Sequence, residues 1–418
     1  MADVDLAGLT RDIDAHLEGA DADLARHYPG ERAGRQPVHT AYVPADRFTA
    51  RTAKSYGDEA QRVVLEHAGL LLELLDGDDD LLDRLLEKLG SEPVEDVRID
   101  FEDGYGTRPD DEEDEAATAA ATALRAAIAE GTATPFHGIR VKSLEPATRH
   151  RGLRTLVRFV ETLTDGGPLP DGFVVTLPKV TSVEQVEAMV LALAHLESAL
   201  SLGDGVLRFE IQVETPQSVL GADGTVPVAR MIRAAEGRCT GLHYGTYDYS
   251  AACAIAAPFQ SLEHPAADHA KAVMQAAAAG TGVRLSDGST NVLPVGDTDA
   301  VRRGWETHLR LVRRSLERGF YQGWDLHPAQ LPTRYAATFR FYRDGFADAA
   351  ERLSAYSAAD SDRADGSVLD EPATARALAD FLLRGLDCGA LGQDETAEAT
   401  GLDADRLADL ARRPRREE

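Results

Sequence analysis

The sequence predicts a (β/α)8 barrel, an α/β fold in which eight parallel strands alternate with helices. From residue 38 onward, eight short apolar runs alternate with longer segments of helical period. The runs extend over about 290 residues, a length typical of one closed barrel. No GxGxxG motif follows the first run, which disfavours an open dinucleotide-binding sheet.

The apolar runs give the expected strands, and the segments between them give the expected helices. The strands are expected at 38–43, 94–101, 137–141, 172–177, 208–213, 239–245, 282–285 and 319–326. The helices are expected at 50–90, 111–130, 149–164, 182–202, 226–236, 265–279 and 299–318. We therefore expect an N-terminal helical extension (1–37), a catalytic barrel (38–332) and a C-terminal helical appendage (333–418). Within the appendage, 357–371 reads as a mobile loop followed by two helices.

Composition excludes several classes of partner. The formal net charge is -27, so the surface repels nucleic acid and anionic membranes, and neither is an expected partner. The three cysteines show no CxxC spacing, which argues against zinc and against a disulfide framework. The chain lacks a signal-peptide pattern and any apolar run of about 18 residues, so we expect a cytoplasmic protein.

Charged residues follow six of the eight apolar runs. In a (β/α)8 barrel the chemistry lies at the carboxyl ends of the strands, where such residues meet. The residues concerned are Asp100, Glu102, Asp103, Arg140, Lys142, Lys179, Glu214, Asp248, Asp325 and His327. The sequence therefore predicts one site at one end of the barrel.

Two of these carboxylates are candidate metal ligands. Strand residues alternate between faces, so Glu210, Gln212 and Glu214 should share one side, and Glu214 should reach the mouth. Asp248 follows the next strand. Two carboxylates with oxygens from water and substrate suit Mg²⁺ or Mn²⁺. Alternatively, Glu214 pairs with an arginine and Asp248 caps a helix, and spacing alone does not separate these interpretations.

The basic strand-end residues also allow two interpretations each. Arg140 offers a bidentate fork for a substrate carboxylate, or forms a salt bridge to the acidic run at 100–103, and both can hold together. Lys179 could form a Schiff base with a keto substrate. We favour that route less, because the carboxylate pair already supplies an electrophile. The acidic run at 110–115 is expected to solvate a helix start rather than bind metal.

The histidines point to structural roles. His243 lies inside a strand, where a partnered core residue is the usual outcome. His327 precedes a proline, and we favour a backbone hydrogen bond over proton donation. His264 and His269 are five residues apart, a poor spacing for a helical metal pair.

Seven segments, in order from about residue 38 to 332, resemble motifs of the citrate lyase β-subunit and pyruvate-dependent (HpcH/HpaI-type) aldolase family. This family lies within the phosphoenolpyruvate/pyruvate barrel superfamily. The segments are AYVPADRF, IDFEDG, GIRVKS, TLPKV, VETPQSV, YGTYDYSA and WDLHPAQ. The chain departs from the family pattern at Ala45, where glycine is usual, and at Lys142, where asparagine is frequent. The segments 49–93 and 214–248 are also long.

The resemblance implies a role for each matched residue. Arg140 would bind the carboxylate of a 2-keto acid, and Glu214 and Asp248 would hold Mg²⁺ or Mn²⁺. Gly245 and Pro216, in the same segments, would line the substrate site. The remaining matched residues would bind the metal's waters or act in catalysis; they are Asp100, Glu102, Asp103 and Lys179.

The function implied is a magnesium-dependent carbon–carbon lyase or aldolase. Its substrate would be a keto acid, either alone or as part of a coenzyme A thioester, and the protein would be a homo-oligomer. The segment GLHYGTYDYS is also similar to malate synthase, so a Claisen-type synthase stays open, as does an enzyme that uses phosphoenolpyruvate. A non-catalytic, degenerate barrel is the least favoured class, because such a site has no reason to keep these carboxylates and the arginine.

Overall fold

The computed structural model describes residues 5–32, 34–361 and 372–411, and eight of its strands form one parallel sheet. The strands are β1 (His39–Pro44), β2 (Asp96–Asp100), β3 (Phe136–Arg140), β4 (Phe173–Leu177), β5 (Phe209–Val213), β6 (Cys239–Tyr244), β7 (Arg284–Ser286) and β8 (Gly323–Asp325). They pair in the order β7-β6-β5-β4-β3-β2-β1-β8. A bridge between Ser286 and Gln322 brings β7 to β8, so the barrel nearly closes and the predicted fold class is confirmed.

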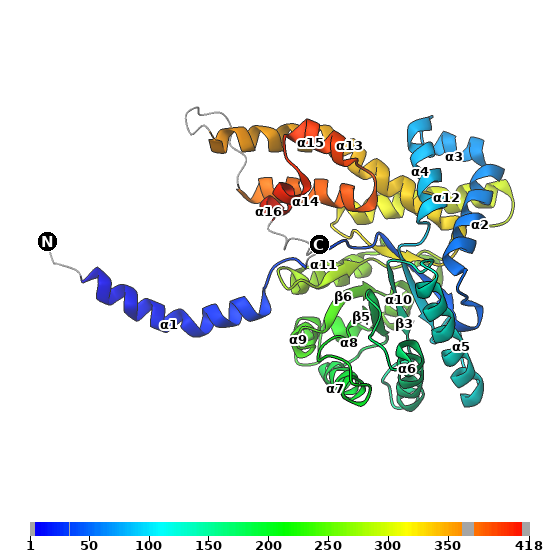
Figure 1. Cartoon of the computed structure of the whole chain (residues 1–418), viewed down its shortest axis with the longest axis horizontal. Helices are drawn as coiled ribbons and strands as arrows, with labels where there is room; N and C mark the ends of the chain where they lie inside the picture. The colour runs from blue at the N-terminus through cyan, green and yellow to red at the C-terminus, as the bar shows by residue number, and fades with distance from the viewer. Residues whose placement is uncertain (1–4, 33, 362–371, 412–418) are drawn as a thin grey trace.

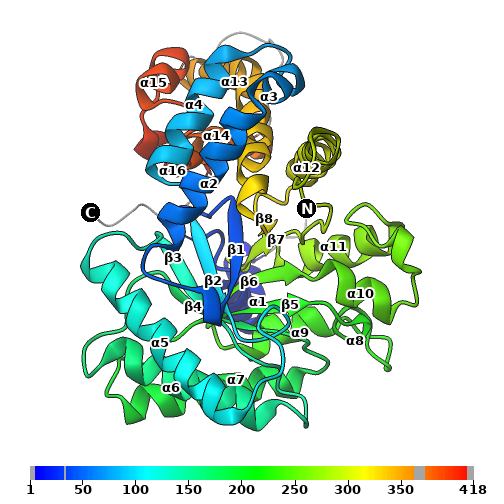
Figure 2. The same cartoon turned by 90° about the vertical axis from the view of Figure 1, so that its right-hand side faces the viewer.

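Helices cover the outside of this barrel (Figure 2). They are α2 (Thr52–Glu66), α3 (Ala68–Leu74), α4 (Asp79–Ser91), α5 (Asp110–Ala129), α6 (Arg149–Thr164), α7 (Val183–Ala199), α8 (Pro216–Val219), α9 (Pro227–Ala234), α10 (Thr246–Ala252), α11 (Pro265–Ala278) and α12 (Thr298–Glu317). The prediction of a single helix over 50–90 is wrong, because the structure has three helices there, α2, α3 and α4. Asp76 and Gly77 adopt left-handed φ angles of 55° and 79°, which end the helical path, and Asp78 caps the next helix.

The last strand is also shorter than expected. Only Gly323–Asp325 are extended within the run 319–326. Gly319 has a φ of 81° and closes the turn after α12, so the first residues of the run belong to a connection.

The hydrophobic core lies between the strands and the surrounding helices. Ile99, Val175, Ile211 and Leu242 point outward from the barrel and are completely buried under helices. The alternate residues of the same strands point into the barrel, where many of them are polar. A period of two therefore separates an apolar outer layer from a polar interior.

The barrel interior is held together by paired charges. Arg98 on β2 donates to both carboxylate oxygens of Glu210 on β5 at 2.9 Å, and to Asp96 at 2.6 Å. His243 on β6 lies 2.9 Å from Glu210, so it is the partnered core residue that the sequence predicts. Glu210 and Gln212 are both buried in this interior, on the face that they share with Glu214. Each of these three buried side chains thus has a partner of opposite charge or a hydrogen-bond partner, which a low-dielectric interior requires.

The two ends of the chain are helical. Helix α1 (Leu6–His27) stands away from the rest of the molecule, and none of its residues is buried (Figure 1). Helices α13 (Leu331–Ser361), α14 (Pro372–Cys388), α15 (Gln393–Thr400) and α16 (Ala404–Ala411) lie together beside α2–α4 (Figure 2). Of the loop expected at 357–371, residues 357–361 are part of α13, and 362–371 lie outside the described residues. The division into three domains stays a prediction.

Within the residues that the structure describes, no helix has the length and apolar character needed to cross a membrane.

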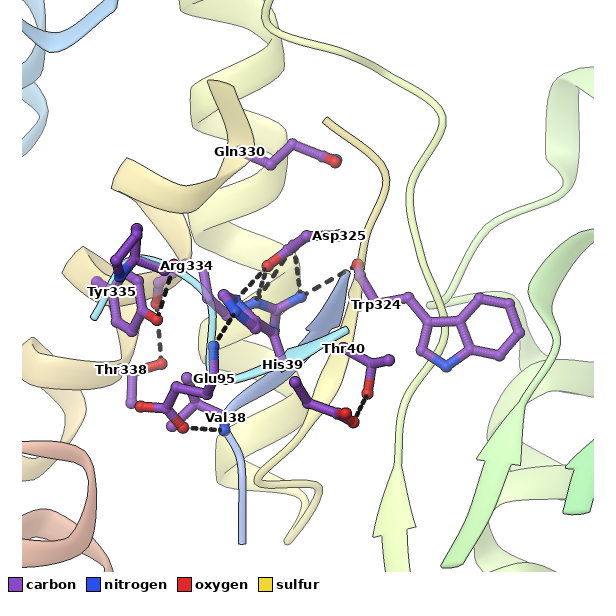
Figure 3. A network of polar contacts seen from close by, with 12 residues as sticks. Val38, His39, Thr40, Glu95, Trp324, Asp325, Gln330, Arg334, Tyr335 and Thr338 are labelled. Carbon is purple, nitrogen blue, oxygen red and sulfur yellow. Dashed lines mark hydrogen bonds and ion pairs between the residues drawn. The ribbon is translucent and has the colours of Figure 1, made fainter. Parts of the chain in front are cut away.

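A buried network centred on Asp325 ties the C-terminal helices to the barrel (Figure 3). The Asp325 carboxylate accepts a hydrogen bond from Arg334 of α13 at 3.0 Å. It also lies 2.9 Å from His39 Nδ1 on β1 and 3.1 Å from His308 Nε2 on α12. The backbone N–H of Glu95 donates to the other nitrogen of His39 at 3.1 Å, which assigns the His39 proton to the nitrogen facing Asp325. Asp325, one of the strand-end charges, is therefore structural.

The network predicts a large loss of stability for Asp325→Asn. This change leaves the buried Arg334 without its counter-ion, so the free energy of unfolding in denaturant should fall by about 3–5 kcal/mol. Asp344→Asn is the matched control, because Asp344 is half exposed and pairs with Arg313 at the surface; it should cost less than about 1 kcal/mol. Equal stabilities of the two variants would contradict the role given to Asp325.

Candidate active site

A cavity of about 840 Å³ opens at the carboxyl ends of the strands. Its lining includes most of the residues that the sequence singles out: Asp100, Asp103, Arg140, Glu214, Gly245 and Asp248. Glu102 and Lys179 lie beside this lining, as their contacts below show. Pro216 does not line the cavity, because it is the first residue of α8, beyond the turn that follows Glu214.

Arg140 and Asp100 form the base of the site. They are the last residues of the neighbouring strands β3 and β2 and lie opposite each other in the register. The guanidinium donates to both oxygens of Asp100 at 2.7 Å, and a further nitrogen lies 3.2 Å from Glu102. Burial opposes the charge of Asp100, but Arg140 outweighs it, so the pKa of this carboxyl is lowered. The salt bridge to the acidic run thus exists, and it fixes the arginine at the cavity wall.

Glu214 is buried at the mouth directly after β5. Its Oε1 accepts a hydrogen bond from the backbone N–H of Lys179 at 2.7 Å. Burial raises the pKa of Glu214 to about 8, and the charges of Glu102 and Asp248 add to this shift. Among the described residues, no arginine forms a salt bridge with Glu214, so the alternative of an arginine partner does not hold.

Gly245 lets the turn after β6 pass close to Glu214. A Cβ at this position would lie 2.3 Å from the Glu214 Cβ and 2.5 Å from its Oε2. Any side chain would therefore push the carboxylate out of place. The structure thus shows that Gly245 leaves the space that the Glu214 carboxylate occupies.

Asp248 lies in the first turn of α10 with 44% of its side chain exposed. Burial raises its pKa even though the nearby Lys179 lowers it. It does not cap the helix, because the capping position of α10 is Gly245 and no side chain bonds there. The capping interpretation of Asp248 is therefore not what the structure shows.

Lys179 places its ammonium group among carboxylates. Its Nζ contacts Glu102, lies 2.8 Å from Asp103 and lies 3.9 Å from Asp248. Burial alone would lower the lysine pKa, but these carboxylates outweigh it and raise the pKa. A lysine must lose its proton to attack a carbonyl, so this environment does not favour the Schiff-base route.

The charges of the mouth do not balance. Five carboxylates gather here: Asp100, Glu102, Asp103, Glu214 and Asp248. Among the described residues, the cations that form salt bridges with this group are Arg140 and Lys179, and the exposed Arg47 also lines the cavity. Among the described residues, no group of three or more histidine, cysteine, aspartate or glutamate side chains is arranged to hold a metal ion. Glu214 and Asp248 could supply two oxygens, and water or substrate would supply the rest. This donor set is of the type that a hard divalent cation takes, and burial raises the pKa of both carboxyls, so each needs a proton or a cation as its partner.

The structure adds residues that the sequence reasoning missed. Tyr42 and Trp324 form an aromatic pair in the cavity wall, with ring centroids 4.6 Å apart, and Arg140 lies over the Tyr42 ring. Arg47, exposed after β1, also lines the cavity. Arg47 follows a strand end in the same way as the other site residues, and that signal could have found it. The two rings of the aromatic pair come from β1 and β8, which lie far apart in the sequence, so no local sequence pattern predicts their contact.

Three other expectations are resolved by the structure. His327 accepts a hydrogen bond from the backbone N–H of Ala329 at 3.1 Å, so the expected backbone hydrogen bond is present.

Lys142 donates to the Phe101 carbonyl at 2.7 Å and to Glu113 at 2.6 Å, so this buried lysine holds the turn after β2 against α5. Glu113 is completely buried. The expectation that the whole run 110–115 is solvated is therefore wrong at Glu113, because this lysine partners it.

The fold and the mouth define a parallel eight-stranded barrel with an acidic site built around an arginine. The chain belongs to the family described as Domain of unknown function (DUF6986), whose model matches residues 17–415. No curated protein shows significant similarity to the sequence.

Several solved structures are similar in fold. A citrate lyase from Burkholderia xenovorans LB400 is 19% identical over 88% of this chain and 97% of its own, with a TM-score of 0.61. The magnesium/glyoxylate complex of Haloferax volcanii malate synthase is 14% identical over 91% of this chain and 99% of its own, with a TM-score of 0.52. Its lead(II) complex is 16% identical over the same shares, with a TM-score of 0.50. These likenesses confirm, at the level of fold, the resemblance that the motifs indicate.

The raised pKa of Glu214 predicts a pH dependence of stability. In protein freed of metal on a chelating resin, the folded-state pKa of about 8 lies above the unfolded value of about 4.3. Between these values the folded state binds more protons than the unfolded state, so stability falls as pH rises from about 5 to 8. Glu214→Gln should remove this contribution. Denaturation midpoints at several pH values should therefore rise for the variant relative to the parent as pH increases, and parallel profiles would contradict the shift.

Proposed function

We propose that the protein is a magnesium-dependent carbon–carbon lyase or aldolase that acts on a 2-keto acid or an acyl-coenzyme A type of substrate. The observation that carries the proposal is the carboxylate excess around Glu214 and Asp248, placed across the mouth from a fixed arginine. Such a site attracts a cation and an anionic substrate together. A chain of net charge -27 has no long-range attraction for an anion, so local groups must supply it.

Glu214 and Asp248 would hold the metal ion. When bound, a divalent cation supplies Lewis-acid stabilisation for the charge that develops on the keto-acid oxygen. The assignment is supported by the raised pKa of both carboxyls, each of which gains a partner when a cation binds. The malate synthase of similar fold was solved as a magnesium/glyoxylate complex.

Arg140 would bind the substrate carboxylate. Asp100 and Glu102 already hold its guanidinium at 2.7 Å and 3.2 Å, so little side-chain entropy is lost when a substrate binds. The neighbouring rings of Tyr42 and Trp324 give this part of the cavity an apolar wall. An arginine in such a dry setting binds a carboxylate more strongly than one in open water.

Glu102 is the carboxylate that we assign to proton transfer. Asp100 is engaged by Arg140 and has a lowered pKa, so it is a poor base. Burial raises the pKa of Glu102, which makes it a stronger base than Asp100. In the cleavage direction, Glu102 would take the proton of the substrate hydroxyl as the carbon–carbon bond breaks. The bonding electron pair then stays on the keto-acid half as an enolate, whose carbon is protonated to finish the reaction.

A malate-synthase-like Claisen condensation is the second candidate. It is supported by the likeness in fold to malate synthase over 91% of this chain. The same arginine and carboxylates would serve it, with glyoxylate or a similar keto acid as the electrophile. A requirement for coenzyme A thioesters distinguishes this candidate from an aldolase.

The proposal predicts metal-dependent turnover that Glu214→Gln removes. A panel of hydroxylated keto acids and acyl-coenzyme A esters, assayed with and without Mg²⁺, should release pyruvate or glyoxylate only with metal. The variant should lose at least about a hundredfold in activity and in Mn²⁺ affinity measured by calorimetry, since even indirect partners of a metal contribute tenfold to a hundredfold. Glu187→Gln on the exposed face of α7 is the control and should match the parent. Unchanged Mn²⁺ binding by Glu214→Gln would show that the ligand assignment is wrong.

A trapping experiment separates the metal route from the Schiff-base route. Because Lys179 stays protonated among Glu102, Asp103 and Asp248, incubation with pyruvate and borohydride should leave the protein mass unchanged. A reduced adduct on Lys179 in peptide mass spectra would instead support an aldolase of the lysine type.

A further inference from the structure

A second cavity, of about 900 Å³, opens at the amino-terminal end of the barrel, opposite the candidate active site. Its walls come from the starts of strands and from the segment that precedes β1. Asp96 and Phe173 are the first residues of β2 and β4, and Gly34 precedes β1. Five arginines line it: Arg32, Arg35, Arg98, Arg208 and Arg284. This gathering of positive charge stands out in a chain whose net charge is -27.

Two of the five arginines are committed to carboxylates. Arg98 is held by Glu210 and Asp96 at the cavity floor, and Arg35 donates to Glu92 at 3.0 Å. These ion pairs neutralise the two arginines, so little of their positive charge is left for a ligand.

The other three arginines are held differently. Arg284 donates to the backbone carbonyls of Gly34 and Arg35 at 2.8 Å and 2.7 Å, which fix its position at the wall. Arg32 donates to the Cys239 carbonyl at 3.3 Å. Among the residues that the structure describes, the exposed Arg208 side chain has no hydrogen bond and no salt bridge. The carbonyl partner of Arg32 orients its guanidinium but does not neutralise its charge.

Arg32 and Arg208 also repel each other. Burial lowers the pKa of Arg32, and the positive charge of Arg208 lowers it further. The lining contains one exposed carboxylate, Asp171, besides the two engaged by Arg98. Among the described residues, no carboxylate pairs with Arg32 or Arg208, and two such charges brought together raise the energy of the folded protein unless an anion joins them.

We propose that this cavity binds a small-molecule anion that carries at least two negative charges, as carboxylate or phosphate groups. Arg32 and Arg208 come from separate segments, so they can hold separate charged groups of one ligand, and Arg284 adds positive charge to the same wall. Guanidinium forks suit carboxylate and phosphate oxygens equally well. The loop 166–172 has glycine at three positions in the wall, which leaves room for such a molecule. The site is independent of the proposed catalytic function, because it lies at the other end of the barrel.

Binding to the full-length protein tests this site. Citrate and pyrophosphate are titrated by calorimetry in resin-treated, metal-free buffer at constant ionic strength, with acetate and chloride as monovalent comparisons. Arg208→Glu is the informative variant, since its exposed side chain has no partner whose loss would unfold the protein. Arg158→Glu on α6 is the matched control, because it makes the same charge change at an exposed position outside the cavity.

The parent and Arg158→Glu should bind citrate, pyrophosphate or both, and Arg208→Glu should bind at least about tenfold more weakly. Binding of citrate alone would identify a polycarboxylate, and binding of pyrophosphate alone would identify a phosphate compound. The proposal is overturned if neither anion binds the parent or if Arg208→Glu binds as tightly as the parent. Equal responses to acetate and chloride would overturn it as well, because these would reflect general screening.

Discussion

Everything proposed for the mouth of this barrel depends on the burial of Glu214 among other carboxylates. A carboxylate removed from water needs a cation or a proton, and burial together with Glu102 and Asp248 raises the pKa of Glu214 to about 8. Arg140 lowers this pKa only in part, because one edge of its guanidinium is bound to Asp100 at 2.7 Å. Lys179 also stabilises the Glu214 carboxylate only in part. Its backbone N–H donates to Glu214, while its ammonium group pairs with the acidic residues after β2. A divalent cation would satisfy the remaining charge.

The polar interior of the barrel keeps these groups in place. Arg98, Glu210 and His243 form a paired layer below the mouth, and Glu214 directly follows the strand that carries Glu210. At Gly138 a Cβ would lie 1.8 Å from the Val174 carbonyl oxygen, so β3 and β4 approach so closely that only glycine fits. Arg140 follows Gly138 on the same face of β3 and is therefore directed toward the mouth. Strand geometry thus sets the positions of Asp100 and Arg140 at the base of the site.

Much of this arrangement could be predicted from the sequence because it follows from local periodicity. The alternation of apolar runs and helical segments fixes the fold, and the carboxyl end of each run marks Asp100, Arg140 and Glu214 as neighbours. Pro216 was misplaced because α8 begins there and turns the chain away from the cavity. The role of Glu113 was also missed, since its partner Lys142 comes from another strand end.

The remaining features depend on contacts between distant segments. The Asp325 network joins β1 to α12 and α13, and the arginines of the amino-terminal cavity come from segments more than 170 residues apart, Arg32 and Arg208 among them. Neither the Asp325 network nor the group of arginines produces a periodic or local pattern in the sequence. Breaks in helices are equally hard to foresee where, as at Asp76, a residue other than glycine takes a left-handed conformation.

The most direct test of the central claim is anomalous diffraction from crystals soaked in Mn²⁺ together with a keto acid. The account predicts one strong anomalous peak between the carboxylates of Glu214 and Asp248, with the keto acid beside it and its carboxylate on Arg140. A mouth that binds the keto acid but shows no peak between these two carboxylates, or a peak elsewhere in the molecule, would contradict it.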